Sequence, residues 1–202
     1  MIRTKLGARP AARIAAAASL LAACAFAHAA EKLAIRTAHG DPREQAAAEQ
    51  LRRIVERYDV ERWIYTRDIA IDQDAIPHSH PVLTLDLGAP DDERVQLASF
   101  VHEQFHWYLN SREADVDKAK ADFRKLYPDA PFGKRIGARD RESTYLHLIV
   151  CDLELQAMTK LVGEAQARKI LGGWRHYTWI YERVLTDPEV RRINAKYGLL
   201  LP

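Results

Sequence analysis

The sequence predicts an α+β domain in which a small, mainly antiparallel sheet packs against helices and the C-terminal half is helical. Three observations favour this fold class. Apolar residues recur at helical spacing around residues 42–58 and again over most of the chain after residue 90. Between these segments, residues 62–87 alternate apolar and polar side chains and contain turn residues, as short paired strands do. A length of 202 residues, 48% of them hydrophobic, suits one domain with a sizeable core.

Residues 1–29 have the layout of a secretory signal peptide. Four basic residues precede an apolar run from Ile14 to Ala27, which ends in an Ala-His-Ala sequence. This order predicts an exported, periplasmic or extracellular protein, because the run is too short for a membrane span. The sequence Leu-Ala-Ala-Cys24 within the run resembles a lipobox, so a lipid on Cys24 that anchors the protein at the membrane surface is the alternative. Residues 31–202 are then expected to form a single domain.

Charge and cysteine content exclude two kinds of protein. The signal segment carries four basic residues and no acidic residue, so its removal changes the formal net charge from +2 to −2. Nucleic acid is therefore not expected as a partner, since a nucleic-acid-binding domain has a basic excess. Without Cys24, the remaining Cys151 cannot form an internal disulfide, so the fold depends on its core, on a metal ion, or on both.

The first predicted elements are a helix and a group of short strands. The segment GDPREQ supplies a capping aspartate, a proline for the first helical position and a glutamate three residues after the cap. It predicts a helix over about 42–58. Residues 62–87 should form two or three short strands, with an irregular segment at QDAIPHSHP between them.

Helices are expected over the rest of the chain. The segment APDDERVQLASFVHEQFHWYLNS has helical periodicity, and its acidic residues suit a first helical turn. A shorter helix over about 114–126 precedes a loop rich in Pro and Gly. The segment DRESTYLHLIVCDLELQAMTKLVG is apolar on most sides, which is typical of a buried helix. Three short helices should follow, interrupted at Gly172-Gly173 and at Pro188.

The sequence H-E-Q-F-H at residues 102–106 carries the main functional signal. On a helix, side chains four residues apart lie about 40° apart and one turn along, so His102 and His106 project from one face. Two imidazoles so placed can bind one zinc ion per chain, with Glu103 beside them. A glutamate there can take a proton from a metal-activated water and pass it to a leaving amine. The alternative is that the two histidines lie on an ordinary packing helix.

This motif resembles the active-site helix of the zincin metallopeptidases. The resemblance covers the five motif residues closely and the order of strand and helix around them loosely. It implies a zincin-like fold and an enzyme that hydrolyses peptide bonds. His102 and His106 would be the zinc ligands and Glu103 the general base. Leu109 and Arg112 stand where a metzincin has glycine and histidine, and the chain has no Gly-Thr-x-Asp of the aspzincin kind. The arrangement is therefore gluzincin-like, with a glutamate from a following helix as third ligand.

Among the later glutamates, Glu154 is the preferred third ligand. It lies between two leucines in the middle of the predicted long helix, where a carboxylate is costly to bury unless a cation or hydrogen-bond donors receive it. A buried salt bridge is the alternative. His147, two turns earlier on the same face, could stabilise a developing oxyanion, support a ligand, or be the third ligand itself. Tyr177 or His176 could donate a hydrogen bond to the tetrahedral intermediate.

Two other functions remain open at this point. A zinc-dependent hydrolase of a non-protein amide would need the same ligands and would differ only in its pocket. A non-catalytic binding protein could retain zinc for stability. His78 and His80 could hold a second metal ion, but we expect them in a solvated loop.

Overall fold

The structure is a computed structural model that describes residue 1, residues 32–133 and residues 135–202. The predicted signal peptide, with Cys24, lies outside the described residues. Glu31–Pro202 form one compact unit. Among the described residues, no helix is both long enough and apolar enough to cross a bilayer.

The N-terminal part is a β-α-β unit extended by one strand. Strand β1 (Ala34–Thr37) leads into helix α1 (Pro42–Arg57) and the short 3-10 helix η1 (Glu61–Trp63). The chain then returns to form β2 (Asp68–Ile71) beside β1, and β3 (Leu83–Leu85) pairs with the other edge of β2. The sheet has the order β1-β2-β3, and both pairs are parallel.

The prediction of a mainly antiparallel sheet is wrong. An antiparallel pair needs only a tight turn, whereas a parallel pair needs a connection that returns the chain to the same end of the sheet. Helix α1 with η1 makes that return between β1 and β2, and residues 72–82 make it between β2 and β3. The sequence analysis did not identify β1, and without it α1 could not be recognised as a crossover. Within the described residues, an isolated antiparallel bridge joins His78 to Thr84 at the outer edge of β3.

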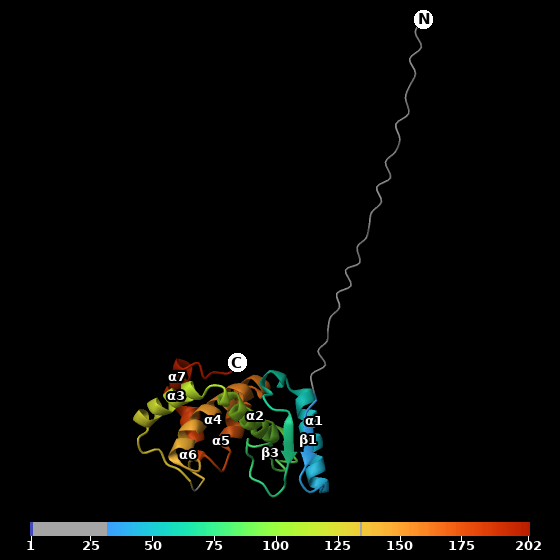
Figure 1. Ribbon diagram of the computed structural model, residues 1–202, viewed down its shortest axis with the longest axis horizontal. Coiled ribbons are helices and arrows are strands. Elements are labelled where there is room, and N and C mark those ends of the chain that lie inside the picture. Colours follow the sequence, from blue (N-terminus) through green and yellow to red (C-terminus); the bar gives the residue numbers. More distant parts are fainter. Residues whose placement is uncertain (2–31, 134) are drawn as a thin grey trace. The chain divides into compact units, whose positions relative to one another are not determined.

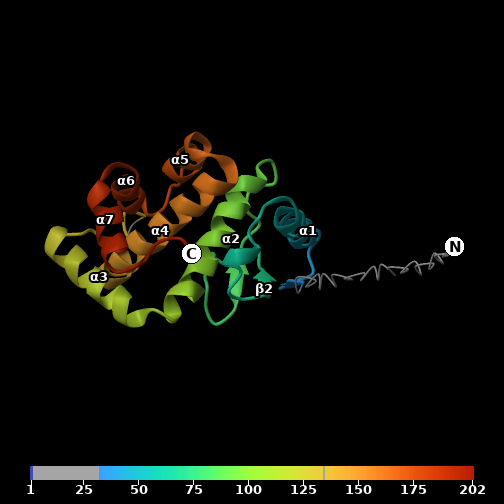
Figure 2. The ribbon, with the colours of Figure 1, turned by 90° about the horizontal axis from the view of Figure 1, so that it is seen from above.

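The remainder of the chain is helical, as predicted. Helix α2 (Glu93–Asn110) contains the H-E-Q-F-H sequence. Figures 1 and 2 both show α2 between the sheet with α1 on one side and the later helices on the other. These later helices are α3 (Glu113–Leu126), α4 (Arg141–Val162), α5 (Glu164–Gly172), α6 (Thr178–Thr186) and α7 (Pro188–Lys196).

The helix ends follow the signals in the sequence. The Asp41 carboxylate accepts the backbone N–H of Arg43 at the start of α1, and Asp140 caps α4 in the same way through Ser143. Gly163 ends α4 with a φ of 83°, a conformation that glycine adopts without a steric penalty. The predicted breaks after α5 and before α7 are confirmed.

Helices α2 and α4 form the centre of the core. Phe100, Phe105 and Leu148 are fully buried, and the two helices contact each other directly. Burial of each such side chain contributes about 1.5–3 kcal/mol relative to exposure. This apolar packing fixes the position of one helix against the other, and with it the polar side chains that both helices carry at their contact.

Candidate metal centre

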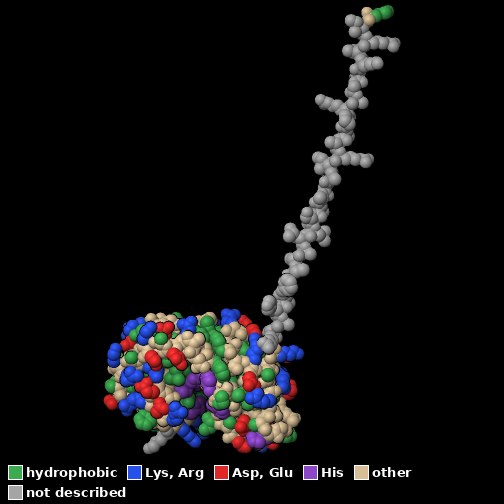
Figure 3. Space-filling model, viewed as in Figure 1, with side chains coloured by type: hydrophobic (Ala, Val, Ile, Leu, Met, Phe, Trp, Pro, Cys, Tyr) green, Lys and Arg blue, Asp and Glu red, His purple; other side chains and the backbone are tan. Residues whose placement is uncertain are grey.

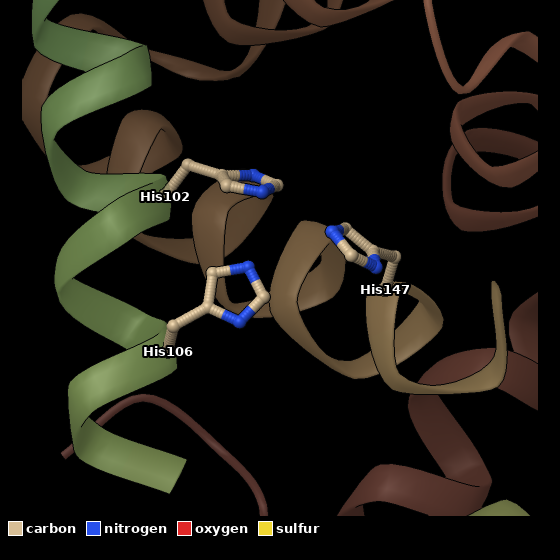
Figure 4. Close-up of side chains that lie close together, drawn as sticks. All are labelled: His102, His106 and His147. Carbon is tan, nitrogen blue, oxygen red and sulfur yellow. The ribbon is translucent and has the colours of Figure 1, made fainter. Parts of the chain in front are cut away.

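Three histidines converge where α2 meets α4. His102 and His106 come from α2 and His147 from α4, and Figure 4 shows the three imidazoles pointing toward one another. One ring nitrogen of each lies within 4.8 Å of those of the other two. The ring centroids are 5.3 Å apart for His102 and His106, 5.6 Å for His102 and His147, and 5.0 Å for His106 and His147.

The protonation state of two of these imidazoles, those of His106 and His147, suits metal binding. Nδ1 of His147 lies 2.6 Å from the Ser143 carbonyl oxygen and donates its proton there, which leaves the Nε2 lone pair free. Burial beside the other imidazoles lowers the pKa of His147 to about 3 and that of His106 well below its ordinary value. Both are therefore neutral near pH 7, which is the form that binds a metal ion.

His102 is oriented by a buried carboxylate. Its Nδ1 lies 2.9 Å from Oε2 of Glu154, and the Tyr181 hydroxyl donates to the same oxygen at 2.8 Å. Burial alone would lower the pKa of His102, but the Glu154 carboxylate raises it well above its ordinary value. A ligating histidine commonly donates its second ring N–H to a carboxylate in this way.

The predicted third ligand, Glu154, thus lies in the site, but it also belongs to a second group. Oxygen, sulfur and nitrogen atoms of Glu154, Cys151 and His102 lie within 4.8 Å of one another. Burial raises the pKa of the Cys151 thiol, which disfavours the thiolate that a metal ion requires. One oxygen of Glu154 already accepts two hydrogen bonds. The three imidazoles therefore form the better donor set, with His147 in the third place.

One buried atom remains without a partner at this centre. Oε1 of Glu154 makes no hydrogen bond within the described part of the chain, although the residue is completely buried. A lone buried carboxylate oxygen is costly unless a cation lies near it. The three imidazoles fit a zinc ion by their donor chemistry, and the unpartnered oxygen belongs to the carboxylate that contacts His102.

Glu103 lines a cavity of about 540 Å³. It is only 6% exposed, and burial raises its pKa to about 7. His102, Tyr177 and His176 line the same cavity. Figure 3 shows histidine side chains gathered in a hollow on this face of the molecule. A substrate that entered the cavity would therefore meet Glu103 and one member of the histidine centre, His102.

The middle residue of the motif fixes α2 to the N-terminal half. The side-chain oxygen of Gln104 accepts the backbone N–H groups of Tyr65, at 2.8 Å, and Thr66, at 3.0 Å. Its amide nitrogen donates to the Thr66 carbonyl at 2.8 Å. Phe105, on the same turn, is buried in the core. These contacts set the rotation of α2 so that His102, Glu103 and His106 face α4 and the cavity.

Tyr177 lies next to the histidine centre. Its ring centroid lies 4.5 Å from that of His147 and 6.3 Å from that of His102. Its backbone has a φ of 54°, which is uncommon for a non-glycine residue and often marks a functional position. Burial raises the pKa of its phenol, which therefore stays protonated and able to donate.

Tyr181 is a site residue that the sequence analysis did not select. It follows Tyr177 by one helical turn, and its hydroxyl reaches Glu154 in the core. The signal that could have identified it is this four-residue spacing next to a residue already selected.

His78 and His80 lie outside the histidine centre. His78 forms the bridge to β3, and the His80 ring stacks on Trp107 with centroids 4.3 Å apart. Asn110 lies 2.7 Å from Nε2 of His80. Within the described ranges, neither histidine belongs to a group of side chains that could hold a metal ion.

Comparisons of the chain with protein-family models, with curated proteins and with solved structures found no match. The functional assignment of the chain therefore depends on the geometry and chemistry of the site itself.

Proposed function

We propose that this protein is an exported, zinc-dependent metallopeptidase of the zincin type. In this proposal His102, His106 and His147 bind the zinc ion, and Glu154 holds His102 through its Nδ1. The observation that carries the proposal is the convergence of three imidazoles, one of which, His102, lines an open cavity together with the buried Glu103. Three protein ligands with an accessible fourth position are typical of catalytic zinc sites, whereas structural sites are closed by four.

A zinc ion held by these imidazoles would supply a Lewis acid that acidifies water and polarises a carbonyl oxygen. Glu103, which lines the cavity next to His102, takes a proton from the attacking water and passes it to the leaving nitrogen. Tyr177 donates its hydroxyl proton in a hydrogen bond to the oxygen on which negative charge develops. The carboxylate of Glu154 keeps the His102 ring in the orientation that aims its other nitrogen at His106 and His147.

The part of the cavity wall that comes from residues 75–77 favours a peptide as the substrate. An extended peptide can bind along a strand edge, and β3 is the strand that precedes the active-site helix. The outer edge of β3 is already bridged by His78, so the rim is the preceding segment, where Ala75, Ile76 and Pro77 line the cavity. Ile76 is 86% exposed there and offers an apolar contact to a substrate side chain.

The proposal is tested by zinc content and turnover measured on the same preparations. Residues 31–202 should contain about one zinc per chain by elemental mass spectrometry and should cleave peptides from an unbiased mixture. Glu103→Gln should retain its zinc and its melting temperature but lose turnover by a factor of at least about 10². His147→Ala should lose the zinc.

Two results would contradict this proposal. A wild-type protein that binds no zinc after reconstitution would exclude the metal centre. Zinc retained in His147→Ala but lost in Glu154→Gln would make Glu154 the third ligand, as the sequence analysis preferred.

A further inference from the structure

We propose that Arg135 recognises a carboxylate group of the substrate, with Arg139 adding positive charge to the same wall of the cavity. This inference rests on the proposed peptidase function and names its substrate class. Both arginines line the cavity that contains His102 and Glu103. Figure 3 shows basic side chains next to the hollow in which the histidines gather.

The loop that carries Arg135 is closed on itself. The Gly133 N–H donates to the Ala138 carbonyl at 2.6 Å. The buried Thr144 hydroxyl accepts the Ala138 N–H at 3.0 Å and lies 3.2 Å from the Pro131 carbonyl oxygen. A Cβ atom at Gly137 would fall 2.2 Å from that same oxygen, so only glycine fits this position. The loop is therefore a fixed element of the cavity wall.

The same loop is attached to the segment that contains Tyr177. The Arg135 carbonyl accepts the Thr178 N–H at 3.1 Å, and the Ile136 carbonyl accepts the Trp179 N–H at 3.0 Å. These two bonds hold Arg135 next to a residue that we place in the active site. An arginine here acts on groups of the substrate close to the bond that is cleaved.

The backbone at Arg135 adopts a conformation that favours glycine. Its φ is 67°, in the left-handed region that a non-glycine residue enters at a cost. Gly133, two residues earlier in the same loop, has a similar φ of 66°, and there the residue is a glycine. The Ile136 N–H donates to the Gly133 carbonyl at 3.0 Å, so the positive φ of Arg135 belongs to a tight turn that presents its side chain at the cavity wall.

The Arg135 guanidinium is available to a ligand. Within the described part of the chain, no carboxylate forms an ion pair with it. Arg139 differs, since its Nε donates to Asp140 at 3.1 Å. Asp86 also lines the cavity, where it accepts the Gly88 N–H at 2.9 Å. Its negative charge would repel an anion, which confines a substrate carboxylate to the arginine wall.

A carboxylate is the group that fits this wall. The planar guanidinium presents paired N–H donors whose spacing matches the two carboxylate oxygens. In a peptide, that carboxylate belongs either to an aspartate or glutamate side chain or to the free C-terminus. The two sources share the same chemistry at Arg135 and differ in where the peptide ends.

Calorimetric titration of the zinc-loaded Glu103→Gln protein tests the inference without turnover. The first probes are peptides without other charged side chains that carry one glutamate at successive positions. The second are the same peptides with glutamine in place of the glutamate. Each is prepared with a free and with an amidated C-terminus. At least one carboxylate peptide should bind about tenfold more tightly than its neutral counterpart. A preference for glutamate identifies the side chain, and a preference for the free acid identifies the C-terminus.

The added substitution Arg135→Gln should abolish this preference and leave the binding of neutral peptides unchanged. Arg53→Gln is the matched control, because Arg53 is an exposed arginine of α1 that does not line the cavity. Arg135→Glu should reverse the preference toward peptides with lysine at the same position. Equal melting temperatures of these variants would exclude misfolding as the cause.

Three outcomes overturn the inference. They are no binding of any peptide, equal binding of charged and neutral peptides, and a preference that survives Arg135→Gln. Cleavage by the wild type is measured separately. Normal cleavage without a carboxylate preference would reject only the role of Arg135, whereas a preference without cleavage would reject only the peptidase function.

Discussion

Two pairs of histidine and glutamate occur in the part of the chain that the structure describes, and they differ in what surrounds them. His39 contacts Glu44 at 2.8 Å in the N-terminal half, and His102 contacts Glu154 at 2.9 Å at the contact of α2 and α4. Each pair lies within 4.8 Å of a third side chain that could share a metal ion, Asp72 in the first case and Cys151 in the second. Distance alone therefore does not distinguish them.

The hydrogen bonds of the two carboxylates separate a structural pair from a metal centre. Glu44 accepts the backbone N–H and the ring of His39 and also the Gln73 N–H, so donors occupy both of its oxygens. Glu154 keeps one buried oxygen without a partner, and its histidine faces two further imidazoles. The first pair ties the ends of β1 and β2 to α1, whereas the second has donor atoms left for a ligand.

The largest expected effect that separates the pairs is on zinc content. His102→Ala should reduce bound zinc from about one per chain to none, because two imidazoles alone bind zinc far more weakly than three. His39→Ala, the matched change in the other pair, should leave zinc content unchanged. Elemental mass spectrometry of both variants after dialysis measures this, and zinc loss in His39→Ala would refute the distinction.

A smaller effect is expected when the two glutamates are exchanged for glutamine. Glu154→Gln should weaken zinc affinity about 10- to 100-fold, because a carboxylate that orients a ligating histidine is replaced by a neutral amide. Glu44→Gln should not change it. Competition with a chelator of known affinity measures both values. Equal affinities in the two variants would mean that Glu154 does not support the metal centre.

Tyr181→Phe tests the support of Glu154 more finely. The change removes one hydrogen bond to a buried carboxylate and should cost about 1–3 kcal/mol of unfolding free energy in the zinc-free protein. Zinc should raise the unfolding free energy of the wild type and of the variant, because it binds only the folded state. Urea unfolding with and without zinc measures the difference. Tyr65→Phe is the control, since the Tyr65 ring is partly exposed and lies outside the histidine centre.

The smallest effect concerns the acid stability of the N-terminal pair. Burial would raise the pKa of Glu44, but its hydrogen bonds with His39 and Gln73 lower it to about 2, against 4.5 for an ordinary glutamate. A carboxyl whose folded-state pKa is lowered contributes stability that is complete above its unfolded pKa and is lost as pH falls. Melting temperature should therefore decrease between about pH 4.5 and pH 2, and less so in Glu44→Gln. Parallel curves would refute this contribution.

The parts of the site that lie on one helix could be predicted from the sequence, and the parts that join helices could not. The spacing of His102 and His106 follows from the helical repeat alone. His147 and Glu154 were placed on the correct face of their helix, but which of them meets the two histidines depends on how α4 crosses α2. That crossing is set by side-chain packing, which no local pattern encodes.

The sheet shows the same limit. Helices were identified within a few residues because their apolar periodicity extends over many turns. Strand β1 has only four residues, which are too few for an alternating pattern to stand out. Without β1, the sequence could not show that the strands of the sheet are parallel. Arg135 was not selected either, because nothing in the Pro- and Gly-rich loop indicates that it lines the same cavity as His102 and Glu103.

The bonds between Gln104 and residues 65–66 connect metal binding to a distant observable property. The N–H groups of Tyr65 and Thr66 are protected from solvent exchange only while Gln104 stays in place between His102 and His106. Removal of zinc should loosen this turn of α2, so these two amides should exchange with deuterium faster in the zinc-free protein. Amides in α7, which do not contact the motif, should keep their rates. The two amides would then serve as built-in reporters of metal occupancy.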